Sequence, residues 1–303
     1  MTSLNLCEKR EPLFSDYCQF LLAGFQNFTQ THFADHSDKW SQDQLNRLLN
    51  TERISARELW RSVRNDIDFD EDGYILFEDT VLPTPYAEEI QPVRRQWSGC
   101  EKRVIQGIGL LTCVYVNPKT PRYGILDYRI YDYDRDGKTK LQPLEDLLRT
   151  AYFVKCVPFR KVLIDAWYAS LRGMKAIHAL STIYDAPLKW NRLVNDSDGV
   201  DSHKRVDALT WTQAERRQGK LVHIKKFPRD HQVKVFRIAS ASGRTEYIAT
   251  NDLSQSDAKA SQREGRLRWK IEQLHRELKQ TPGISKCQRR QHRGQRNHIA
   301  CCL

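Results

Sequence analysis

The sequence predicts an α/β protein in which helices cover one mixed sheet, a helical domain precedes the sheet and a β-rich insertion interrupts it. Three observations predict this fold class. Residues 1–67 place apolar side chains at helical spacing, and residues 74–190 then alternate strand-like runs with amphipathic helices. Residues 191–251 return to short strand-like runs separated by Gly, Pro and Asp, in a block too long for a loop.

The composition is that of a folded protein. Of the 303 residues, 40% are hydrophobic, with seven Trp, 12 Tyr and 11 Phe, which is unlike a disordered chain. No apolar run approaches the roughly 20 residues that cross a bilayer. The first residues, MTSLNLCEKREPLF, contain acids in place of the apolar core of a secretion signal. We therefore expect no membrane partner and a cytoplasmic location.

The eight cysteines indicate a reducing compartment. They form no CxxC pair and no even ladder of spacings, so a disulfide framework is not expected. A zinc site at Cys287, His292, His298 and Cys301 is the alternative use of these residues, but their spacing matches no familiar zinc finger.

The charge favours a polyanionic partner. The chain carries a formal net charge of +11 and its pI is near 9.3. From Ser261 to Leu303 there are 11 lysines and arginines against three glutamates, a net charge of +8. A basic run of this kind is often a solvated face. Here it lies on a strongly helical segment, so we expect nucleic acid as the partner.

The N-terminal segment predicts three helices. Apolar residues recur at helical spacing in FSDYCQFLLAGF, WSQDQLNRLL and ARELWRSV. Ser41 and Ser55 stand where helix N-caps are expected, and ERI forms a short turn between the last two helices. This arrangement fits either a helix-turn-helix module that contacts DNA or a small helical bundle that only packs.

Strand-like runs follow Gly73 and are rich in β-branched and aromatic residues. The first three are consecutive, which predicts antiparallel pairing. In chain order the predicted core consists of the strands YILFED (74–79), 104–117 and 123–132, the helix LQPLEDLLRTAYFV, the strand RKVLID (160–165), the helix WYASLRGMKAIHAL and the strand TIYDAPLKW. The strands GKLVHIKKF, QVKVFRIAS and TEYIATND are assigned to the insertion.

The strongest predicted helix covers residues 254–280 and ends before Pro282 and Gly283. Apolar side chains at steps of four, three and four residues predict its buried stripe: Leu267, Ile271, Leu274 and Leu278. One position further on, the same steps predict a polar stripe: Arg268, Glu272, His275 and Lys279. Local i,i+4 ion pairs of Glu272 with Arg268 and Arg276 explain these charges structurally. The functional interpretation is that Glu272 binds a metal ion while the neighbouring cations hold a phosphate.

Two aspartates stand at the ends of predicted strands. Asp165 ends KVLID, at the strand tip where catalytic groups of α/β sheets commonly lie, although Asp is equally suited to cap the following helix. Asp79 ends YILFED, and strand alternation places it with Ile75 and Phe77 on an apolar face, where a lone charge is costly without a partner. Acids on neighbouring strands can together hold a hard divalent ion such as Mg²⁺.

Calcium loops are the competing interpretation of some of these acids. DFDEDGYILFED (68–79) has Asp at positions one, three and five, Gly at six and a carboxylate at twelve, and DYDRDGKTKLQP (132–143) starts in the same way. The second stretch ends in Pro143 in place of a bidentate acid, and TVLPTP follows the first in place of a helix. We therefore expect a solvated turn at Asp68, Asp70 and Asp72.

Several motifs around these acids belong together. Arg268, Glu272 and Lys279 follow the spacing Arg-x3-Glu-x6-Lys, and Asp79 and Asp165 lie in FEDT (77–80) and LIDAWYAS (163–170). With YVNPKT, DYRIYD, DGKTK, NDLSQ and GQRNHIA, they resemble the DDE transposases of bacterial insertion sequences, in the IS-four superfamily with its Tyr-x2-Arg-x3-Glu-x6-Lys signature. The resemblance covers essentially the whole chain.

The resemblance implies a ribonuclease-H-like core with the β-rich insertion between the second Asp and the Glu. Asp165 and Glu272 are 107 residues apart, which leaves room for this insertion. It also implies that Asp79, Asp165 and Glu272 bind two Mg²⁺ ions, with Mn²⁺ as a substitute, for in-line phosphoryl displacement. DNA phosphates are expected at Arg268, Arg276 and Lys279. Trp269 is expected either to stack on a displaced base or to lie in the core.

The function implied by the resemblance is cut-and-paste transposition at terminal inverted repeats. The expected partners are double-stranded DNA of the repeats and of the target, with a homodimer in the DNA complex, at the nucleoid of a bacterial cytoplasm. The expected segments are a helical DNA-binding domain (1–68), the first part of the catalytic core (69–190), the insertion (191–253), and the core helix with a basic C-terminal segment (254–303).

Two departures from the family pattern favour an alternative. The signature Tyr falls on Gly265, and the sequence stops at IACCL, within an apolar run that relatives usually continue. A shortened and catalytically inactive remnant that only binds DNA is therefore the second interpretation.

Overall fold

The structure is a computed structural model of the chain. It describes residues 4–23, 28–85, 89–120, 122–197, 202–239 and 245–303. Within these ranges it does not describe the side chains of residues 4–9, 266, 269 and 270.

One mixed sheet organises the molecule, and it has eleven strands in the described residues. The spatial order is β2-β3-β1-β5-β6-β11-β10-β9-β7-β8, with β4 also paired to β3. The pairs β1–β5 and β5–β6 are parallel and the others are antiparallel. The strands are β1 (Tyr74–Pro83), β2 (Arg94–Ser98), β3 (Arg103–Val116), β4 (Tyr123–Tyr131), β5 (Lys161–Ile164), β6 (Ile183–Leu188), β7 (Leu193–Asn195), β8 (Lys204–Arg205), β9 (Lys220–Ile224), β10 (Gln232–Ala239) and β11 (Thr245–Thr250).

Helices flank this sheet, so the predicted α/β fold class is confirmed. They are α1 (Leu4–Leu22), α2 (Gln30–Asp35), α3 (Gln42–Thr51), α4 (Ala56–Val63), α5 (Tyr133–Asp136), α6 (Leu141–Arg149), α7 (Leu171–His178), α8 (Gln213–Gln218), α9 (Ala258–Gln280) and α10 (His292–Cys302), with the π-helical turn η1 (Thr150–Val154) and the 3₁₀ turn η2 (Val206–Ala208). In the described part of the chain, no helix combines the length and the apolar character needed to cross a membrane.

The predicted order of the core strands is confirmed, with one strand missed. Strand β2, with the sequence RRQWS, pairs with the first part of β3. Its buried positions are polar, Gln96 and Ser98, whereas Trp97 between them is 55% exposed. This strand was missed because its pattern is the reverse of the apolar-in, polar-out alternation on which such predictions rest.

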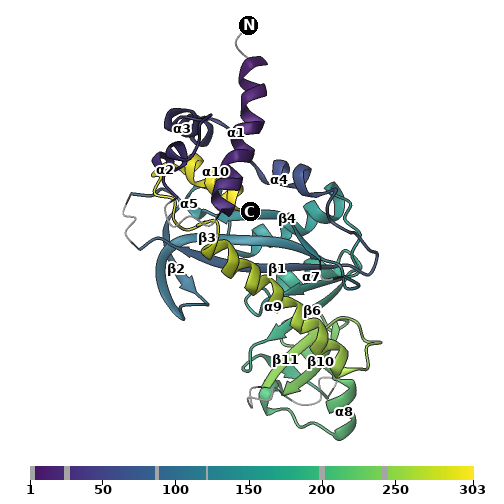
Figure 1. Ribbon diagram of the computed structural model, residues 1–303. Helices are drawn as coiled ribbons and strands as arrows, with labels where there is room; N and C mark the ends of the chain where they lie inside the picture. Colours follow the sequence, from purple (N-terminus) through teal and green to yellow (C-terminus); the bar gives the residue numbers. More distant parts are fainter. Residues whose placement is uncertain (1–3, 24–27, 86–88, 121, 198–201, 240–244) are drawn as a thin grey trace.

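The β-rich block between β6 and α9 continues the same sheet. Strand β11 pairs antiparallel with β6, and β10 and β9 follow. The buried side chains of Val235 and Ala249 belong to the same hydrophobic cluster as Phe77 in β1. This block forms the lower end of the molecule, beside the N-terminal half of α9 (Figure 1).

Two hydrophobic layers lie on opposite faces of β1. On one face Ile75 and Phe77 pack with Leu144 and Leu147 of α6 and Ile177 of α7. On the other face lie side chains from β1, α1, α3, α9 and α10: Leu76, Leu82, Leu13, Leu45, Ile271, Leu274, Leu278 and Ile299. Helix α9 crosses the sheet diagonally on this second face (Figure 1).

The three predicted N-terminal helices form as α1, α3 and α4, and these helices gather around the C-terminal helix. Helix α1 begins earlier than predicted, and the short α2 between α1 and α3 was not predicted. Ser41 caps α3 in a capping box, in which its Oγ accepts from Gln44 N at 3.3 Å and its own N donates to Gln44 Oε1 at 2.8 Å. Helix α10 lies among these helices (Figure 1). The hydroxyl of Tyr17 and Nδ1 of His298 are 2.9 Å apart, and Asn297 Nδ2 donates to the Leu49 carbonyl at 2.8 Å.

Candidate active site

Strands β1 and β5 bring the predicted acids to one end of the sheet. The two strands are parallel, and their last paired residues are Phe77 and Ile164. Position 78 therefore lies beside position 165, because parallel neighbours stay in register. The sequence motifs FEDT and LIDAWYAS thus meet side by side.

Asp79 lies on the α6 side of the sheet, as its alternation with Ile75 and Phe77 predicted. Its Oδ2 accepts a hydrogen bond from Nζ of Lys140, the residue that precedes α6, at 3.1 Å. The Asp79 side chain is 22% exposed and the Lys140 side chain 20%. Lys140 is therefore the partner that an acid on an apolar face requires.

Helix α9 presents its predicted apolar stripe to the opposite face. Ile271, Leu274 and Leu278 are buried there, and Leu267 is partly buried. His275, which we predicted on the polar stripe, is also buried, and its Nε2 lies 2.9 Å from Oγ1 of Thr112. The prediction was wrong at this position because the helix packs closely enough on β3 to bury the residue next to its stripe.

Arg268 and Lys279 reach from α9 to the sheet. Arg268 Nη2 lies 3.0 Å from Asp165 Oδ1 and 3.7 Å from Glu78 Oε2. About three turns further along, Lys279 Nζ donates to Thr80 Oγ1 at 2.7 Å. Both cations therefore follow the β1 face that carries Glu78 and Thr80, and Arg268 pairs with sheet acids rather than within its own helix.

The remaining predicted residues of α9 lie on its outer side. Glu272 and Arg276 are exposed. The side chain of Trp269 lies outside the described residues, so the predicted stacking residue cannot be placed.

Glu78 connects the three predicted acids electrostatically. Burial raises the pKa of Glu78 to about 8, the Arg268 charge lowers it, and the charges of Asp165, Asp79 and Glu272 raise it. All three acids therefore lie within electrostatic reach of this one carboxyl group. Burial, together with the charges of Asp79, Glu78 and Asp165, also raises the pKa of the nearby Tyr168.

Glu78 was not predicted as a site residue. Strand alternation placed it opposite Asp79, and an acid facing away from a candidate site looks like surface. Its position in the FEDT motif, one residue before Asp79, is the feature of the sequence that could have indicated a site residue. In the folded chain α9 covers that face, which leaves the Glu78 side chain only 16% exposed.

A buried charge cluster holds the N-terminal half of α9 in place. Lys161 Nζ, at the start of β5, lies 2.6 Å from Glu264 Oε2 on α9 and 3.3 Å from Asp185 Oδ2 on β6. The Tyr74 hydroxyl donates to Glu264 Oε1 at 3.3 Å. Burial raises the pKa of Asp185 to about 7, although the Lys161 charge lowers it. These contacts fix the helix that carries Arg268 and Glu272.

The chemistry of this carboxylate group fits a divalent cation. Burial is the main cause of the raised pKa of Glu78, and the charges of Asp165, Asp79 and Glu272 add to it. Carboxylates gathered in this way offer the oxygen ligands that a hard divalent cation prefers. In the structure Lys140 and Arg268 provide the positive charge beside Asp79 and Asp165. Across the described residues, no three His, Cys, Asp or Glu side chains already surround one point as a finished metal site.

The two calcium-like stretches have other roles, as expected. Asp70 pairs with Lys119 at 2.7 Å and accepts from Asp72 N at 2.9 Å, which is a turn held by its own contacts. The Asp132 side chain is fully buried, 3.6 Å from an Arg94 guanidinium nitrogen and 3.4 Å from one of Arg296. The alternative zinc set does not form a metal site within the described residues either.

Comparison with known proteins agrees with this arrangement. The family model described as the transposase DDE domain matches residues 79–303. No curated protein matches the sequence. Among solved structures, the chain is similar to the piggyBac transposase in a cryo-EM structure of its synaptic complex with hairpin DNA, with a TM-score of 0.50 and 11% identity. The similarity covers 96% of this chain but only 63% of that chain, and it is a similarity of ribonuclease-H-like fold.

Proposed function

Since the chain belongs to the transposase DDE domain family, we propose that it catalyses cut-and-paste transposition of an insertion sequence. The reactions are phosphodiester hydrolysis and strand transfer at terminal inverted repeats. One observation carries this proposal: parallel pairing of β1 and β5 brings Asp79 and Asp165 to the same end of the sheet, and Arg268 of α9, the helix that carries Glu272, lies 3.0 Å from Asp165 Oδ1. The charges of all three acids also raise the pKa of the largely buried Glu78 between them. Clustered acids with a strongly shifted pKa are typical of a catalytic centre.

Asp79, Asp165 and Glu272 are the proposed catalytic acids and metal ligands. They would hold two Mg²⁺ ions, with Mn²⁺ as a substitute, and bound ions of this kind lower the pKa of the attacking hydroxyl and neutralise charge on the leaving oxygen. Lys140 and Arg268 neutralise Asp79 and Asp165 in the structure. In the loaded site these two cations would be free to contact DNA phosphates.

The polar residues of α9 are the proposed contacts to DNA near the cut. Arg268 suits a bidentate phosphate contact, and Lys279 and Arg276 add point charges along the same helix. Trp269 is the proposed stacking residue. The spacing of Arg268, Glu272 and Lys279 supports assignment to the IS-four group with the Tyr-Arg-Glu-Lys signature.

The proposed partner is double-stranded DNA of the terminal repeats and of the target. The similar piggyBac transposase was solved in a synaptic complex with hairpin DNA, which supports a DNA partner here. Because two ends must be joined, a homodimer in the DNA complex is part of the proposal, as is a location at the bacterial nucleoid. In the proposed division residues 1–68 bind DNA, 69–190 and 254–303 form the catalytic core with its basic C-terminal segment, and 191–253 are the insertion.

The test is strand cleavage of a duplex that carries the terminal repeat of the element's own flanks. Cleavage is expected with Mg²⁺ or Mn²⁺, and none with EDTA or in Asp165→Ala. Asp134→Ala is the matched control, because this exposed aspartate pairs with Arg94 away from the site. If Asp165→Ala cleaves like the wild type, the assignment of the site is wrong.

An inactive protein that only binds the repeats is the second candidate, favoured by Gly265 at the signature Tyr position. In the cleavage assay it would bind the repeat duplex and leave it intact with either metal. Gly265→Tyr then shows whether the absent Tyr is the only cause of inactivity. If this single change restores cleavage, the missing contact is the one that the signature Tyr makes.

A further inference from the structure

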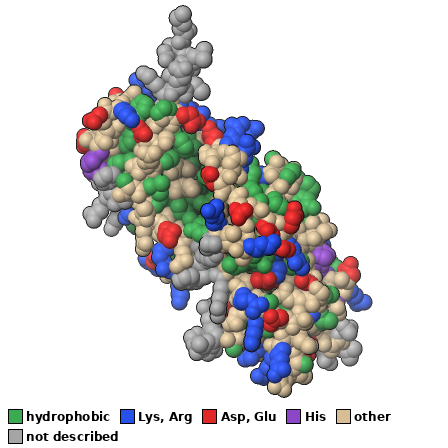
Figure 2. All heavy atoms as spheres, turned by 45° about the vertical axis from the view of Figure 1, so that its right-hand side comes forward, with side chains coloured by type: hydrophobic (Ala, Val, Ile, Leu, Met, Phe, Trp, Pro, Cys, Tyr) green, Lys and Arg blue, Asp and Glu red, His purple; other side chains and the backbone are tan. Residues whose placement is uncertain are grey.

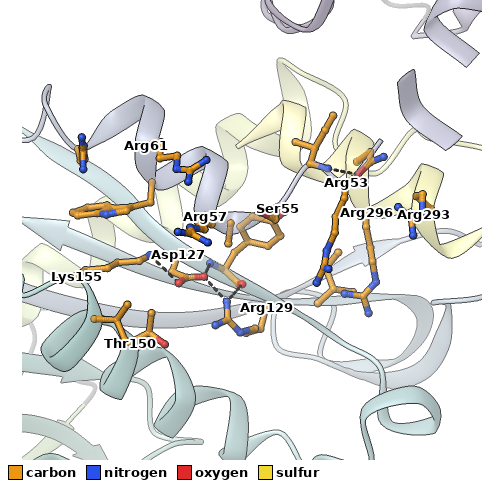
Figure 3. A pocket seen from close by; sticks show the side chains of 18 of the residues that line it. Arg53, Ser55, Arg57, Arg61, Asp127, Arg129, Thr150, Lys155, Arg293 and Arg296 are labelled. Atoms are coloured by element: carbon orange, nitrogen blue, oxygen red, sulfur yellow. Dashed lines mark hydrogen bonds and ion pairs between the residues drawn. The ribbon is translucent and has the colours of Figure 1, made fainter. Parts of the chain in front are cut away.

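A large basic cleft lies at the edge of the sheet, apart from the acids of the candidate site. It encloses about 1310 Å³ between α4, the segment before it, β4, η1 and α10. Figure 3 shows Arg57 and Arg61 on one side, Arg53, Arg293 and Arg296 at one end, and Arg129 and Lys155 beneath. Three segments far apart in the sequence therefore build one cavity.

The charge of this cleft is almost entirely positive. Its lining includes one carboxylate, Asp127, which is 5% exposed and already pairs with Arg129 and with Lys155 Nζ at 2.8 Å. Nine cationic side chains line the cleft: Arg53, Arg57, Arg61, Arg64, Arg129, Arg135, Lys155, Arg293 and Arg296. On the face drawn in Figure 2, by contrast, acidic and basic side chains alternate over the lower half of the molecule.

Five of these arginines have no ion-pair partner within the described residues: Arg53, Arg57, Arg61, Arg64 and Arg135. All five are exposed. Like charges in one cleft repel one another, and a bound polyanion relieves this repulsion and releases its own counterions. The cleft therefore has the electrostatics of a binding site for an anion that the chain itself does not supply.

The two rims are arranged for an extended ligand. Arg57, Arg61 and Arg64 stand at steps of four and three on or directly after α4, and so share one helix face. On the opposite rim Arg293 Nη1 donates to the carbonyls of Thr51 and Glu52 at 3.3 and 3.4 Å, which fixes α10 against the segment before α4. One rim thus presents exposed guanidinium groups without ion-pair partners in the described residues, and the other is held in place by hydrogen bonds.

The size and chemistry of the cleft identify the class of ligand. Pockets for small molecules enclose about 300–1,000 Å³, so this cavity is larger. Its two aromatic lining residues offer no exposed ring, because Tyr128 is buried and the Trp60 ring lies 5.1 Å from Lys155 Nζ. Single-stranded nucleic acid is bound largely by stacking on exposed rings, whereas a duplex backbone needs only donors to phosphate.

We propose that this cleft binds the phosphate backbone of double-stranded DNA. The identity of the polyanion as DNA rests on the proposed function, whereas the preference for an extended duplex backbone rests on the cleft itself. The proposal differs from a helix-turn-helix contact, because the binding surface combines α4 with β4 and α10 and uses no single recognition helix.

Arg129 joins the cleft to the candidate active site. It lines both the cleft and a small pocket that also contains Asp79 and Lys140. Leu111 of β3 pairs with Asp79 on one side and with Arg129 on the other. Two strand spacings separate Arg129 from Asp79, a distance of about 10 Å. A duplex lying in the cleft is therefore led toward the acids.

The test compares Arg57→Ala/Arg61→Ala with Arg216→Ala/Arg217→Ala, which removes the same charge from exposed positions of α8. Binding of a fluorescein-labelled duplex of random sequence is measured by anisotropy in EDTA, between about 50 and 200 mM salt. We expect the cleft variant to lose affinity roughly tenfold or more, and its salt slope to fall by about 2. The α8 control is expected to bind like the wild type.

Three further measurements make the test decisive. Arg57→Lys/Arg61→Lys keeps the charge and is expected to keep most of the affinity, and thermal melting checks that all variants fold. The proposal is overturned if the cleft and α8 variants lose equal affinity, if neither loses any, or if the single strand binds as tightly as the duplex. Binding is measured without metal and in Asp165→Asn, so the result does not depend on cleavage. A protein that binds the duplex through the cleft but never cleaves it would contradict the proposed function and still support the cleft proposal.

Discussion

Nη2 of Arg268 lies 3.0 Å from Oδ1 of Asp165, across 103 residues of sequence. This contact ties α9 to the end of β5, and the same guanidinium is 3.7 Å from Glu78. Arg268 thus lowers the pKa of Glu78 while three other acids raise it. In the proposed function, Arg268 would hold the acids together before a metal binds and contact a phosphate afterwards.

Arg268→Ala is expected to reduce strand cleavage by about 10²–10³-fold, the usual loss when one preorganised donor to developing charge is removed. Arg268→Lys keeps the charge without the fork and is expected to lose less. Arg263→Ala is the control, since this side chain lies on the same helix and is 67% exposed. Cleavage that survives Arg268→Ala undiminished would remove Arg268 from the site.

The raised pKa of Glu78 predicts that the stability of the protein depends on pH. Its folded pKa is about 8 against an ordinary 4.5, so the folded state holds the proton more tightly than the unfolded state. Its contribution to stability is full below about pH 4.5 and is lost as pH rises to about 8. Glu78→Gln, which mimics the protonated form, is expected to raise the melting temperature by a few degrees at pH 8 and by much less at pH 5.

The same residue reports on metal binding. A divalent ion among these acids adds positive charge that lowers the pKa of Glu78, so Mg²⁺ is expected to raise the melting temperature more at pH 8 than at pH 5. EDTA reverses this shift, and Asp165→Asn is expected to abolish it. A shift of equal size in Asp165→Asn would mean that the ion binds elsewhere.

Asp132 predicts a large loss of stability. Its buried carboxylate lies between Arg94 and Arg296, which connects the end of β4 to β2 and α10. Asp132→Ala removes the buried partner of Arg296 and leaves Arg94 with Asp134 alone, so the free energy of unfolding in urea is expected to fall by about 3–5 kcal/mol. The control Asp134→Ala removes a 68% exposed partner of the same Arg94, and is expected to cost less than about 1 kcal/mol.

His275 predicts a sensitivity to acid. Burial lowers its folded pKa to about 4 from 6.5, so the unfolded state binds the proton more tightly. Stability is therefore lost as pH falls from about 6.5 toward 4. His275→Gln is expected to flatten this part of the curve of melting temperature against pH. The exposed His203 is the matched position, and His203→Gln is expected to leave the curve unchanged.

Gly265 predicts a simple gain in stability. A Cβ atom at this position of α9 meets no atom within 4 Å. Gly265→Ala is therefore expected to stabilise the protein against urea by about 1 kcal/mol, the helix propensity difference between the two residues. Gly173→Ala is the contrasting variant, because its Cβ would lie 2.5 Å from the Tyr168 carbonyl oxygen, and it is expected to destabilise.

The predictions from sequence succeeded where one element carries its own pattern. The apolar stripe of α9, the caps of α3 and the strands around Phe77 and Ile164 follow from local spacing. They failed at β2, whose buried side chains are polar, and at His275, whose burial depends on how closely α9 approaches β3. The periodicity of a single segment reveals neither the polar buried face of β2 nor the burial of His275.

The sequence by itself determined the α/β order of elements, the family and the three acids with their spacing, because these are properties of residues along the chain. Only the tertiary structure decided that Glu78 is largely covered beside Asp165, that Arg268 lies against both acids, and that α10 returns to α3 and completes the arginine cleft with α4. The reason is physical: the pKa of a carboxyl group and the charge of a cleft depend on distances between groups through a low dielectric. Those distances exist only once separate segments have packed.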